Sequence, residues 1–446
     1  MQKQKDCVFY PDLNRTYIPV ERGEGRYIYD VNGKKYFDAG SGHIAAIGHG
    51  VKEVYEAMYQ QAQKVSYVHP FLQLTNQPKV ELANKIIEHA PKGMSRAVFF
   101  SGGSEANEGA LRLARIYHML NGNSGKFKIL ARMNSFAGAT MATLALGWRS
   151  YRRYFSHSLP STVLIPPNYC YRCPWDKEYP SCNMRCAWEL DTVIKREGPD
   201  NIAAFICEPV PGLGVGVPPK EYFPIIREIC DKHNVLMITD EVITGFGRLG
   251  GKFFGIEHWG VCPDIITTAK GMAAGYTPLS ALIVSEKVVD CLSKGAADVG
   301  HVAAHTYAGN PASCAGGLAV LNYIVKNNLV QRCEEMSEYL FKKLSPLNNL
   351  SIVGDIRGKG LIIGIEFVAD KESKEPLSRK LKVSENIAAN AMEKGLFVLP
   401  APGFIDGELG DGLLVVPALT VTEDECDNLV DLLAQSIEET QSQVKR

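Results

Sequence analysis

The chain has 446 residues, of which 46% are apolar and 22% are charged, and its formal net charge is −1. This length and composition predict a folded protein with more than one hydrophobic core, and they exclude an intrinsically disordered chain. The balanced charge argues against nucleic-acid binding, and no stretch reaches the roughly 18 uncharged apolar residues of a membrane span. Because the first residues also lack the apolar core of a signal peptide, we expect a cytoplasmic protein that acts on small molecules.

Both ends of the chain predict short strands and helices. An Asn32-Gly33 turn between alternating runs predicts a hairpin near the start. Towards the end, helices and short strands alternate until a final helix that begins with the capping-box pair Thr422 and Glu425. We therefore predict one smaller α+β domain built from both chain ends, residues 1–60 and 326–446.

The middle of the chain, residues 61–325, alternates short apolar runs with helical segments. The runs that we predict as strands are 97–100, 128–131, 203–207, 236–239 and 264–267. Strands that are apolar on both faces are typical of a mostly parallel sheet covered by helices on both sides. Ligands of such α/β sheets lie beyond the carboxyl ends of the strands, so the residues that follow each strand are the first candidates for a functional site.

The first of these strands is followed by SGGSEANE at residues 101–108, which begins a helix. Glycines allow close approach of the backbone, and the free N–H groups at a helix N-terminus attract anions. Gly103 and Ser104 are therefore predicted to bind a phosphate group. The alternative is an ordinary strand-to-helix turn in which Ser104 caps the helix.

Three further strand ends carry an aromatic ring and two carboxylates. Phe136 stands where it can either stack on a flat cofactor ring or pack in the core. Glu208 and Asp240 each follow directly after a predicted strand. A carboxylate at a buried strand end needs a compensating cation, which is either a protonated ring nitrogen or a side chain such as Arg248.

Lys270 lies between an apolar run and the glycine-containing loop at 271–278. Burial there would lower the pKa of the amine and make it available as a nucleophile or Schiff base, whereas the alternative is a surface lysine in a loop. Together with Asp240, Phe136 and the anion-binding loop, Lys270 completes what a pyridoxal phosphate site requires: an amine, a partner for the ring nitrogen and a cradle for the phosphate.

These motifs resemble those of the class III, or omega, aminotransferases, which are pyridoxal phosphate enzymes of fold type I. The resemblance covers nearly the whole chain, and its most specific pieces are GSEANE at 103–108, DEVITGFGR at 240–248, KGMAAGYTP at 270–278 and HTYAGNP at 305–311. It implies a large domain with a mostly parallel sheet, the smaller domain described above, and transfer of an amino group to a keto acid.

The resemblance also implies a role for each matching residue around the cofactor ring. Lys270 would form the Schiff base and then move the proton, and Asp240 would pair with the ring nitrogen. Val242 and Phe136 would lie against the two ring faces, with Glu208 nearby.

Around the cofactor phosphate, the resemblance implies that Gly103 and Ser104 bind in their own subunit. Thr306 would contact the phosphate in a neighbouring subunit. The active form is therefore expected to be a homodimer, or a dimer of dimers, with shared sites.

Two positions depart from the family pattern. Many members carry a glutamate and an arginine that gate the α-carboxylate of 2-oxoglutarate or glutamate, where this chain has Leu213 and Leu414. Losing both partners together leaves no buried charge unpaired. We therefore predict a preference for pyruvate over 2-oxoglutarate, with an ω-amino acid, a β-amino acid or a primary amine as donor. A racemase, an epimerase or an aminomutase is the alternative on the same fold.

Further candidates for substrate contact lie in two segments. His43 and Ile44 align with the family's N-terminal pocket segment, and packing explains them equally well. Arg149, Arg152 and Arg153 are candidates for a carboxylate site, with a solvated basic turn as the alternative.

Four cysteines, Cys170, Cys173, Cys182 and Cys186, form a cluster in an insertion that also contains aromatic residues and prolines. Thiols at such spacing can close a structural zinc or iron–sulfur site. The fold does not need such a site, so free or disulfide-paired thiols are the alternative.

Overall fold

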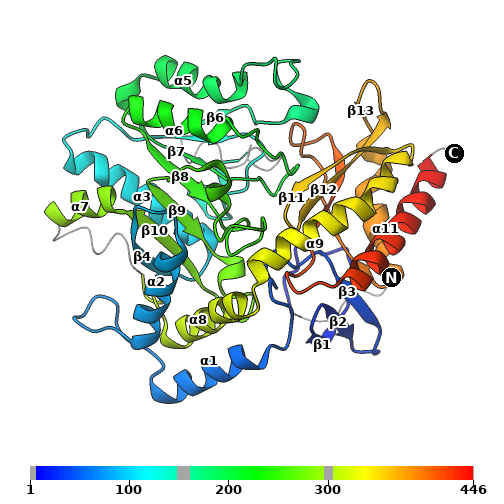
Figure 1. Ribbon diagram of the computed structural model, residues 1–446, viewed down its shortest axis with the longest axis horizontal. Helices are drawn as coiled ribbons and strands as arrows, with labels where there is room; N and C mark the ends of the chain where they lie inside the picture. Colours follow the sequence, from blue (N-terminus) through cyan, green and yellow to red (C-terminus); the bar gives the residue numbers. More distant parts are fainter. Residues whose placement is uncertain (1–6, 148–160, 296–304, 445–446) are drawn as a thin grey trace.

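The computed structural model describes residues 7–147, 161–295 and 305–444. A large sheet with helices on both sides occupies one half of the molecule, and two smaller sheets with three helices occupy the other half (Figure 1). This is the mixed α/β architecture that the sequence predicts. The candidates Arg149, Arg152 and Arg153 lie outside the described residues.

Seven strands form the large sheet. In order across the sheet they are β4 (Met94–Phe100), β10 (Ser280–Ser285), β9 (Ile265–Thr268), β8 (Leu236–Asp240), β7 (Ile202–Cys207), β5 (Lys128–Arg132) and β6 (Thr162–Ile165). The run from β9 to β6 is parallel, whereas β10 is antiparallel to both of its neighbours. The five predicted strands are confirmed. The predicted runs did not include β6 or β10. The antiparallel direction of β10 could not be predicted either, because an apolar run carries no information about strand direction.

Helices cover both faces of this sheet. One face packs against α3 (Gly103–Leu120) and α7 (Glu286–Lys294), and the other against α5 (Arg185–Glu197) and α6 (Tyr222–Lys232). Along β5, Ile129 and Ala131 join the first of these cores and Leu130 joins the second. Because alternate residues of a strand point to opposite faces, two helical layers require strands that are apolar at every position.

The remaining helices near the large sheet are α1 (Lys52–Lys64), α2 (Gln77–His89), the short α4 (Met141–Leu144) and α8 (Pro311–Lys326). Both α1 and α2 pack against α8, below the large sheet in Figure 1. Among the described helices, none is both long and apolar enough to cross a membrane.

The other half of the molecule contains two small sheets. The first has the order β1 (Val20–Glu24), β2 (Tyr27–Asp30), β3 (Lys35–Asp38) and β14 (Leu396–Phe397). The second has the order β11 (Val353–Lys359), β12 (Ile362–Asp370), β16 (Asp411–Val415) and β15 (Leu399–Pro400), with β13 (Glu375–Pro376) beside β12. The helices that pack with them are α9 (Leu329–Leu344), α10 (Val383–Glu393) and α11 (Glu423–Val444).

The two ends of the chain meet in this half. β2 and β3 form the predicted hairpin, and β3 pairs in parallel with β14, which comes from near the other end. Arg26 donates bidentate hydrogen bonds of 2.7–3.0 Å to the Glu425 carboxylate. The backbone N–H of Thr422 also donates to this carboxylate. The capping box predicted for the last helix is thus present. The division of the chain at residues 60 and 326 stays a proposal.

Candidate active site

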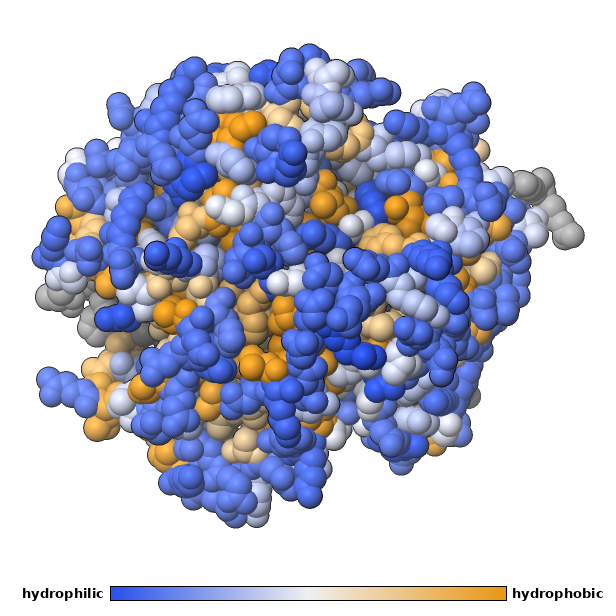
Figure 2. All heavy atoms as spheres, viewed as in Figure 1, coloured by the Kyte–Doolittle hydropathy of each residue, from blue (hydrophilic) through white to orange (hydrophobic). Residues whose placement is uncertain are grey.

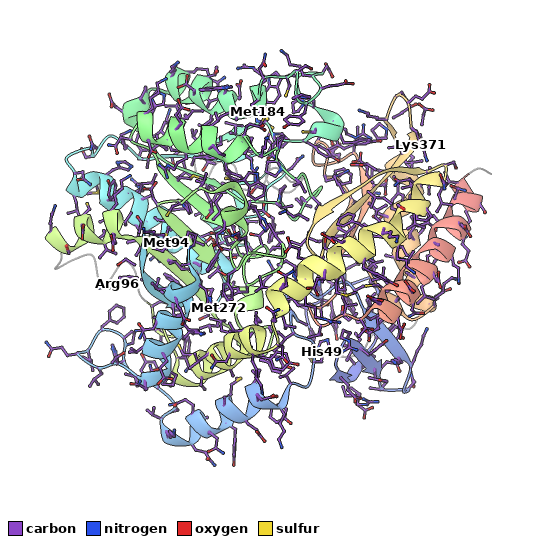
Figure 3. All side chains as sticks on the ribbon, viewed as in Figure 1. His49, Met94, Arg96, Met184, Met272 and Lys371 are labelled. Carbon is purple, nitrogen blue, oxygen red and sulfur yellow. The ribbon has the colours of Figure 1, made fainter. Side chains whose placement is uncertain are left out.

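Residues from the carboxyl ends of β4, β5, β7, β8 and β9 meet in one cavity of about 460 Å³. Its lining residues are Gly103, Ser104, Asn107, Phe136, Ala137, Gly138, Glu208, Asp240, Val242, Ile243, Ala269 and Lys270. These strand ends share an edge because the five strands point the same way. All of the predicted cofactor residues except Thr306 are therefore brought together. Figure 3 labels Met272, two residues beyond Lys270, near the centre of the molecule.

Lys270 follows β9 in an unusual backbone conformation. Its φ of +38° lies in the left-handed region, which residues other than glycine rarely adopt and which is common at functional sites. The side chain is held in the interior, where burial lowers the pKa of the amine while the charges of Asp240 and Glu208 oppose this shift. An amine with a lowered pKa is more often neutral, which is the form that acts as a nucleophile.

Asp240 ends β8 and is 3% exposed. The backbone N–H of Val242 donates to Oδ1 at 3.0 Å, and the Asn107 side-chain amide donates to Oδ2 at 2.7 Å. Burial, followed by the charge of Glu208, raises the pKa of Asp240 to about 7. The alternative partner, Arg248, instead donates to the carbonyls of Gly42 and Pro417.

Glu208 holds the loop that carries the aromatic ring. Its carboxylate accepts hydrogen bonds from the Ser135 hydroxyl at 3.0 Å and from the backbone N–H of Phe136 at 3.1 Å. The backbone N–H of Gly212 donates to its second oxygen at 2.8 Å. These donors connect the loops after β5 and β7, and they place Phe136 at the wall of the cavity.

The start of α3 forms the predicted anion-binding end. A Cβ added at Gly103 would lie 3.0 Å from the Val242 side chain, so a larger residue would crowd the cavity. Glu105 accepts from the backbone N–H groups of Ser101 at 2.8 Å and Gly102 at 3.1 Å. The next N–H groups open the helix, where they have no partner within it and attract an anion.

These groups fit pyridoxal phosphate. The cavity offers a buried amine, a buried carboxylate held by neutral donors and, at Gly103, a helix start without a side chain. A lysine, an aspartate and an anion-binding helix start at the carboxyl edge of a mostly parallel sheet define a fold type I pyridoxal phosphate enzyme.

Comparisons with known proteins agree with this class. The chain matches the class-III aminotransferase family over residues 9–437. It is 35% identical to the uncharacterized aminotransferase YodT of Bacillus subtilis, over 98% of both chains. It is also 35% identical to a diaminobutyrate–2-oxoglutarate transaminase of Halomonas elongata, over 92% of this chain and 88% of that protein.

A solved structure is similar over the full length. An amine transaminase from an uncultivated Pseudomonas species, in its PLP-bound form, superimposes with a TM-score of 0.90 and 32% identity, over 99% of this chain and 100% of that one. The protein described here belongs to the class III aminotransferase family, for which pyridoxal 5′-phosphate is the expected cofactor.

The predicted substrate residues do not all lie together. Burial, and then the charges of Lys270 and Arg248, lower the pKa of His43 to about 4, and His43 is not among the residues that line the cofactor cavity. Ile44 approaches the loop that follows Lys270, 3.4 Å from where a Cβ at Gly275 would lie.

Leu213 and Leu414 do not line the cofactor cavity. Leu213 lines a separate small cavity with Arg132 and Ser135. Leu414 packs in the core beside Val215 and is 8% exposed. Neither side chain lines the cavity that contains Lys270, so contact with a substrate there is a proposal.

Thr306 lies at the surface, close to the start of α3. The preceding residue, His305, stacks on Phe100 with ring centroids 5.3 Å apart, and its Nε2 lies 3.5 Å from a Glu105 oxygen. Thr306 itself is exposed and does not line the cofactor cavity.

The cysteine cluster does not form the predicted metal site. All four thiols are free and line a cavity of about 350 Å³, together with Met184, which Figure 3 labels. No group of three or more His, Cys, Asp or Glu side chains in the described part of the chain is placed to hold a metal ion. Burial, followed by the charges of the neighbouring thiols, raises the pKa of Cys186 to about 12.

The structure also adds a residue that sequence reasoning did not assign. Asn107 lines the cavity and contacts Asp240, although it lies 133 positions earlier in the chain. Its place in the GSEANE motif, one helical turn after Gly103, was the available signal.

The raised pKa of Asp240 predicts a pH-dependent stability. An unfolded aspartate ionises near pH ~3.9, whereas Asp240 in the fold keeps its proton until about pH 7. The free energy of unfolding therefore decreases as pH rises from the pKa of the unfolded state to that of the folded state. We expect cofactor-free Asp240→Asn to equal the wild type near pH ~4 and to be more stable by about 2–4 kcal/mol above pH ~7, as measured by urea unfolding.

Asp264→Asn provides the matched control for this measurement. Despite its burial, the charges of Arg227 and Lys287 lower the pKa of Asp264. This variant should therefore lose stability, and the loss should be larger at neutral than at acid pH. A pH-independent difference between Asp240→Asn and the wild type would contradict the assignment.

Proposed function

We propose that the protein is a cytoplasmic transaminase that moves an amino group from an ω-amino acid, a β-amino acid or a primary amine to a keto acid, with pyruvate preferred over 2-oxoglutarate. The observation that carries this proposal is the half-buried Lys270 amine, which shares one cavity with Asp240 and with the start of α3. The reaction would pass through a Schiff base of Lys270.

When bound, pyridoxal phosphate supplies an electron sink for the carbon that gives up a proton. Lys270, whose pKa is lowered by burial, would take that proton at Nζ and return it later in the reaction. The Asp240 carboxylate would favour a proton on the ring nitrogen, and the N–H groups of Gly103 and Ser104 would hold the phosphate. Phe136 and Val242 would lie against the ring.

Two relatives support the choice of donor. One neighbour is named an amine transaminase, and one relative is named for diaminobutyrate, a substrate with an amino group away from its α-carbon. On this chain, the sequence places leucine at positions 213 and 414, and it contains no arginine between residues 381 and 445. A donor without an α-carboxylate beside the reacting amine needs no such cation.

The amino-transfer reaction is tested by a single half-reaction. With amine donor and no acceptor, we expect one equivalent of amino group to move per cofactor, after which the reaction stops. A racemase, an epimerase or an aminomutase would instead interconvert its substrate with no net change in the cofactor. This outcome would contradict the proposal. Absorbance and chiral chromatography separate these results.

Lys270 is tested in the same assay. Lys270→Ala should lose at least ~10³-fold in rate, because both the nucleophile and the proton carrier are removed. Borohydride should also no longer fix the cofactor covalently. Lys252→Ala, at an exposed lysine, is the matched control and should keep full activity. Unchanged turnover in Lys270→Ala would contradict the role.

The acceptor preference makes a further prediction. The second carboxylate of 2-oxoglutarate needs a charged partner, and leaving a charged group without its hydrogen bond costs about 1.5–3 kcal/mol, or about 10–100-fold in rate. We therefore expect kcat/KM for pyruvate to exceed that for 2-oxoglutarate by at least ~10-fold. Coupled assays with both acceptors and one donor measure the ratio. A higher kcat/KM for 2-oxoglutarate than for pyruvate would contradict the prediction. It would instead agree with the relative that is named for 2-oxoglutarate.

We also propose a homodimer, or a dimer of dimers, with shared sites. Exposed apolar residues gather on α1 and the segment that follows it, namely Tyr55, Tyr59, Phe71, Leu72 and Leu74. Figure 2 shows apolar side chains on the surface at its lower left, where the chain passes from α1 to α2 in Figure 1. Asn310 donates to the carbonyl of Ser66 and Asn76 donates to that of Gly309, so the Thr306 loop adjoins this surface.

Sedimentation at micromolar concentration tests the assembly. The wild type should sediment as a dimer or tetramer, and the double variant Leu72→Glu and Leu74→Glu should dissociate and bind the cofactor at least ~10-fold more weakly, because charges in an apolar interface are costly. Leu381→Glu, at an exposed leucine of the smaller half, is the control. A wild type that sediments as a monomer with full cofactor affinity would contradict shared sites.

A further inference from the structure

The first turn of α3 contains a buried polar residue, Asn107, that is 1% exposed and lines the cofactor cavity. Its Nδ2 donates to Oδ2 of Asp240 at 2.7 Å and to the carbonyl of Ala137 at 2.6 Å. Its Oδ1 accepts from the hydroxyl of Thr267 at 2.6 Å. The side chain therefore connects α3, β8, β9 and the loop that follows β5.

These partners determine the orientation of the amide. A carboxylate and a carbonyl can only accept, so both must face the NH₂ group of Asn107, whereas the Thr267 hydroxyl supplies the donor for its oxygen. The flipped amide would place its oxygen against two acceptors. Asn107 therefore presents an N–H donor to Asp240.

The chemistry of that donor suits the aspartate. Asn107 and the backbone N–H of Val242 each occupy one oxygen of Asp240 and fix the rotamer of the carboxylate. Both donors are neutral, so they favour the ionised carboxylate without adding a positive charge beside it. An arginine or a lysine in place of Asn107 would compete with a protonated ring nitrogen for Asp240.

The position of Asn107 on the helix adds a second property. Gly103 and Ser104 lie four and three residues before it, so all three residues share one face at the start of α3, and all three line the cavity. One turn of α3 thus carries the predicted phosphate-binding groups and the donor that holds Asp240.

We propose that Asn107 is a positioning residue that holds Asp240 ionised and aimed at the ring nitrogen of the cofactor, and that thereby couples the nitrogen end of the site to the phosphate end. This inference rests on the proposed cofactor site. If Asn107 positions Asp240, its effect on cofactor binding must depend on the ring nitrogen. A residue that only packs would show no such dependence.

The experiment compares two ligands. One is pyridoxal phosphate, and the other is its analogue in which carbon replaces the ring nitrogen; the dissociation constants are measured by equilibrium dialysis of the cofactor-free protein. We expect Asn107→Asp to weaken pyridoxal phosphate binding at least ~10-fold at pH ~8 and to weaken binding of the analogue less than ~3-fold, because only the first ligand uses Asp240. The pH at which the bound cofactor changes its visible absorbance should shift as well.

Two controls separate positioning from structure. Asn121→Asp makes the same change at the other end of α3, where the side chain contacts Tyr117 and Cys291, and it should leave both constants unchanged. Thr267→Val removes the hydroxyl behind the amide and keeps its donors, so pyridoxal phosphate affinity should fall less than ~3-fold. If Asn107→Asp does not fold by circular dichroism, Asn107→Ser replaces it with the same expectation.

Three outcomes would overturn the inference: unchanged pyridoxal phosphate affinity in the Asn107 variants, an equal loss for both ligands, or a loss in Thr267→Val as large as in Asn107→Asp. Failure of the proposed cofactor site looks different, because the wild type itself would then bind neither ligand.

Discussion

Burial of the Asp240 carboxylate is the constraint on which the arrangement of the large domain depends. Taking an ionised group out of water costs on the order of several kcal/mol unless its neighbours compensate. Here the compensation comes from the backbone after β8, from the first turn of α3 and from the lysine after β9. These segments are far apart in the sequence, and they meet because parallel strands end at one edge of the sheet. A change that moved one strand end would remove one of these compensating groups.

The same cavity contains a second carboxylate and one lysine. Without a bound cofactor, the site is therefore electrostatically unfavourable. Burial and Glu208 raise the pKa of Asp240, and burial lowers that of Lys270. A cationic ring nitrogen and an anionic phosphate would relieve both. The fold therefore gives up stability at the site to keep these groups ready for a cofactor, as binding and catalytic sites commonly do.

The smaller half of the molecule is held against this site by Arg248, a fully buried guanidinium whose pKa burial lowers to about 10. It donates to the carbonyl of Gly42 from one chain end and to that of Pro417 from the other. The segment after Gly42 carries His43 to the neighbourhood of Lys270. Arg248 thus connects the loop that follows Asp240 to one segment from each end of the chain.

The sequence by itself determined the α/β class, five of the seven strands of the large sheet, the hairpin at Asn32-Gly33 and the order of the motifs around Lys270, because these depend on local spacing and on residue type. Only the tertiary structure decided the direction of β10, the pairing of Asn107 with Asp240, and the fact that Leu213 and Leu414 do not line the cavity. The tertiary structure also decided that the four clustered thiols are free, since spacing in the sequence does not orient side chains. A hydrogen bond between residues 133 positions apart has no local signal, because its geometry exists only once the strands are assembled.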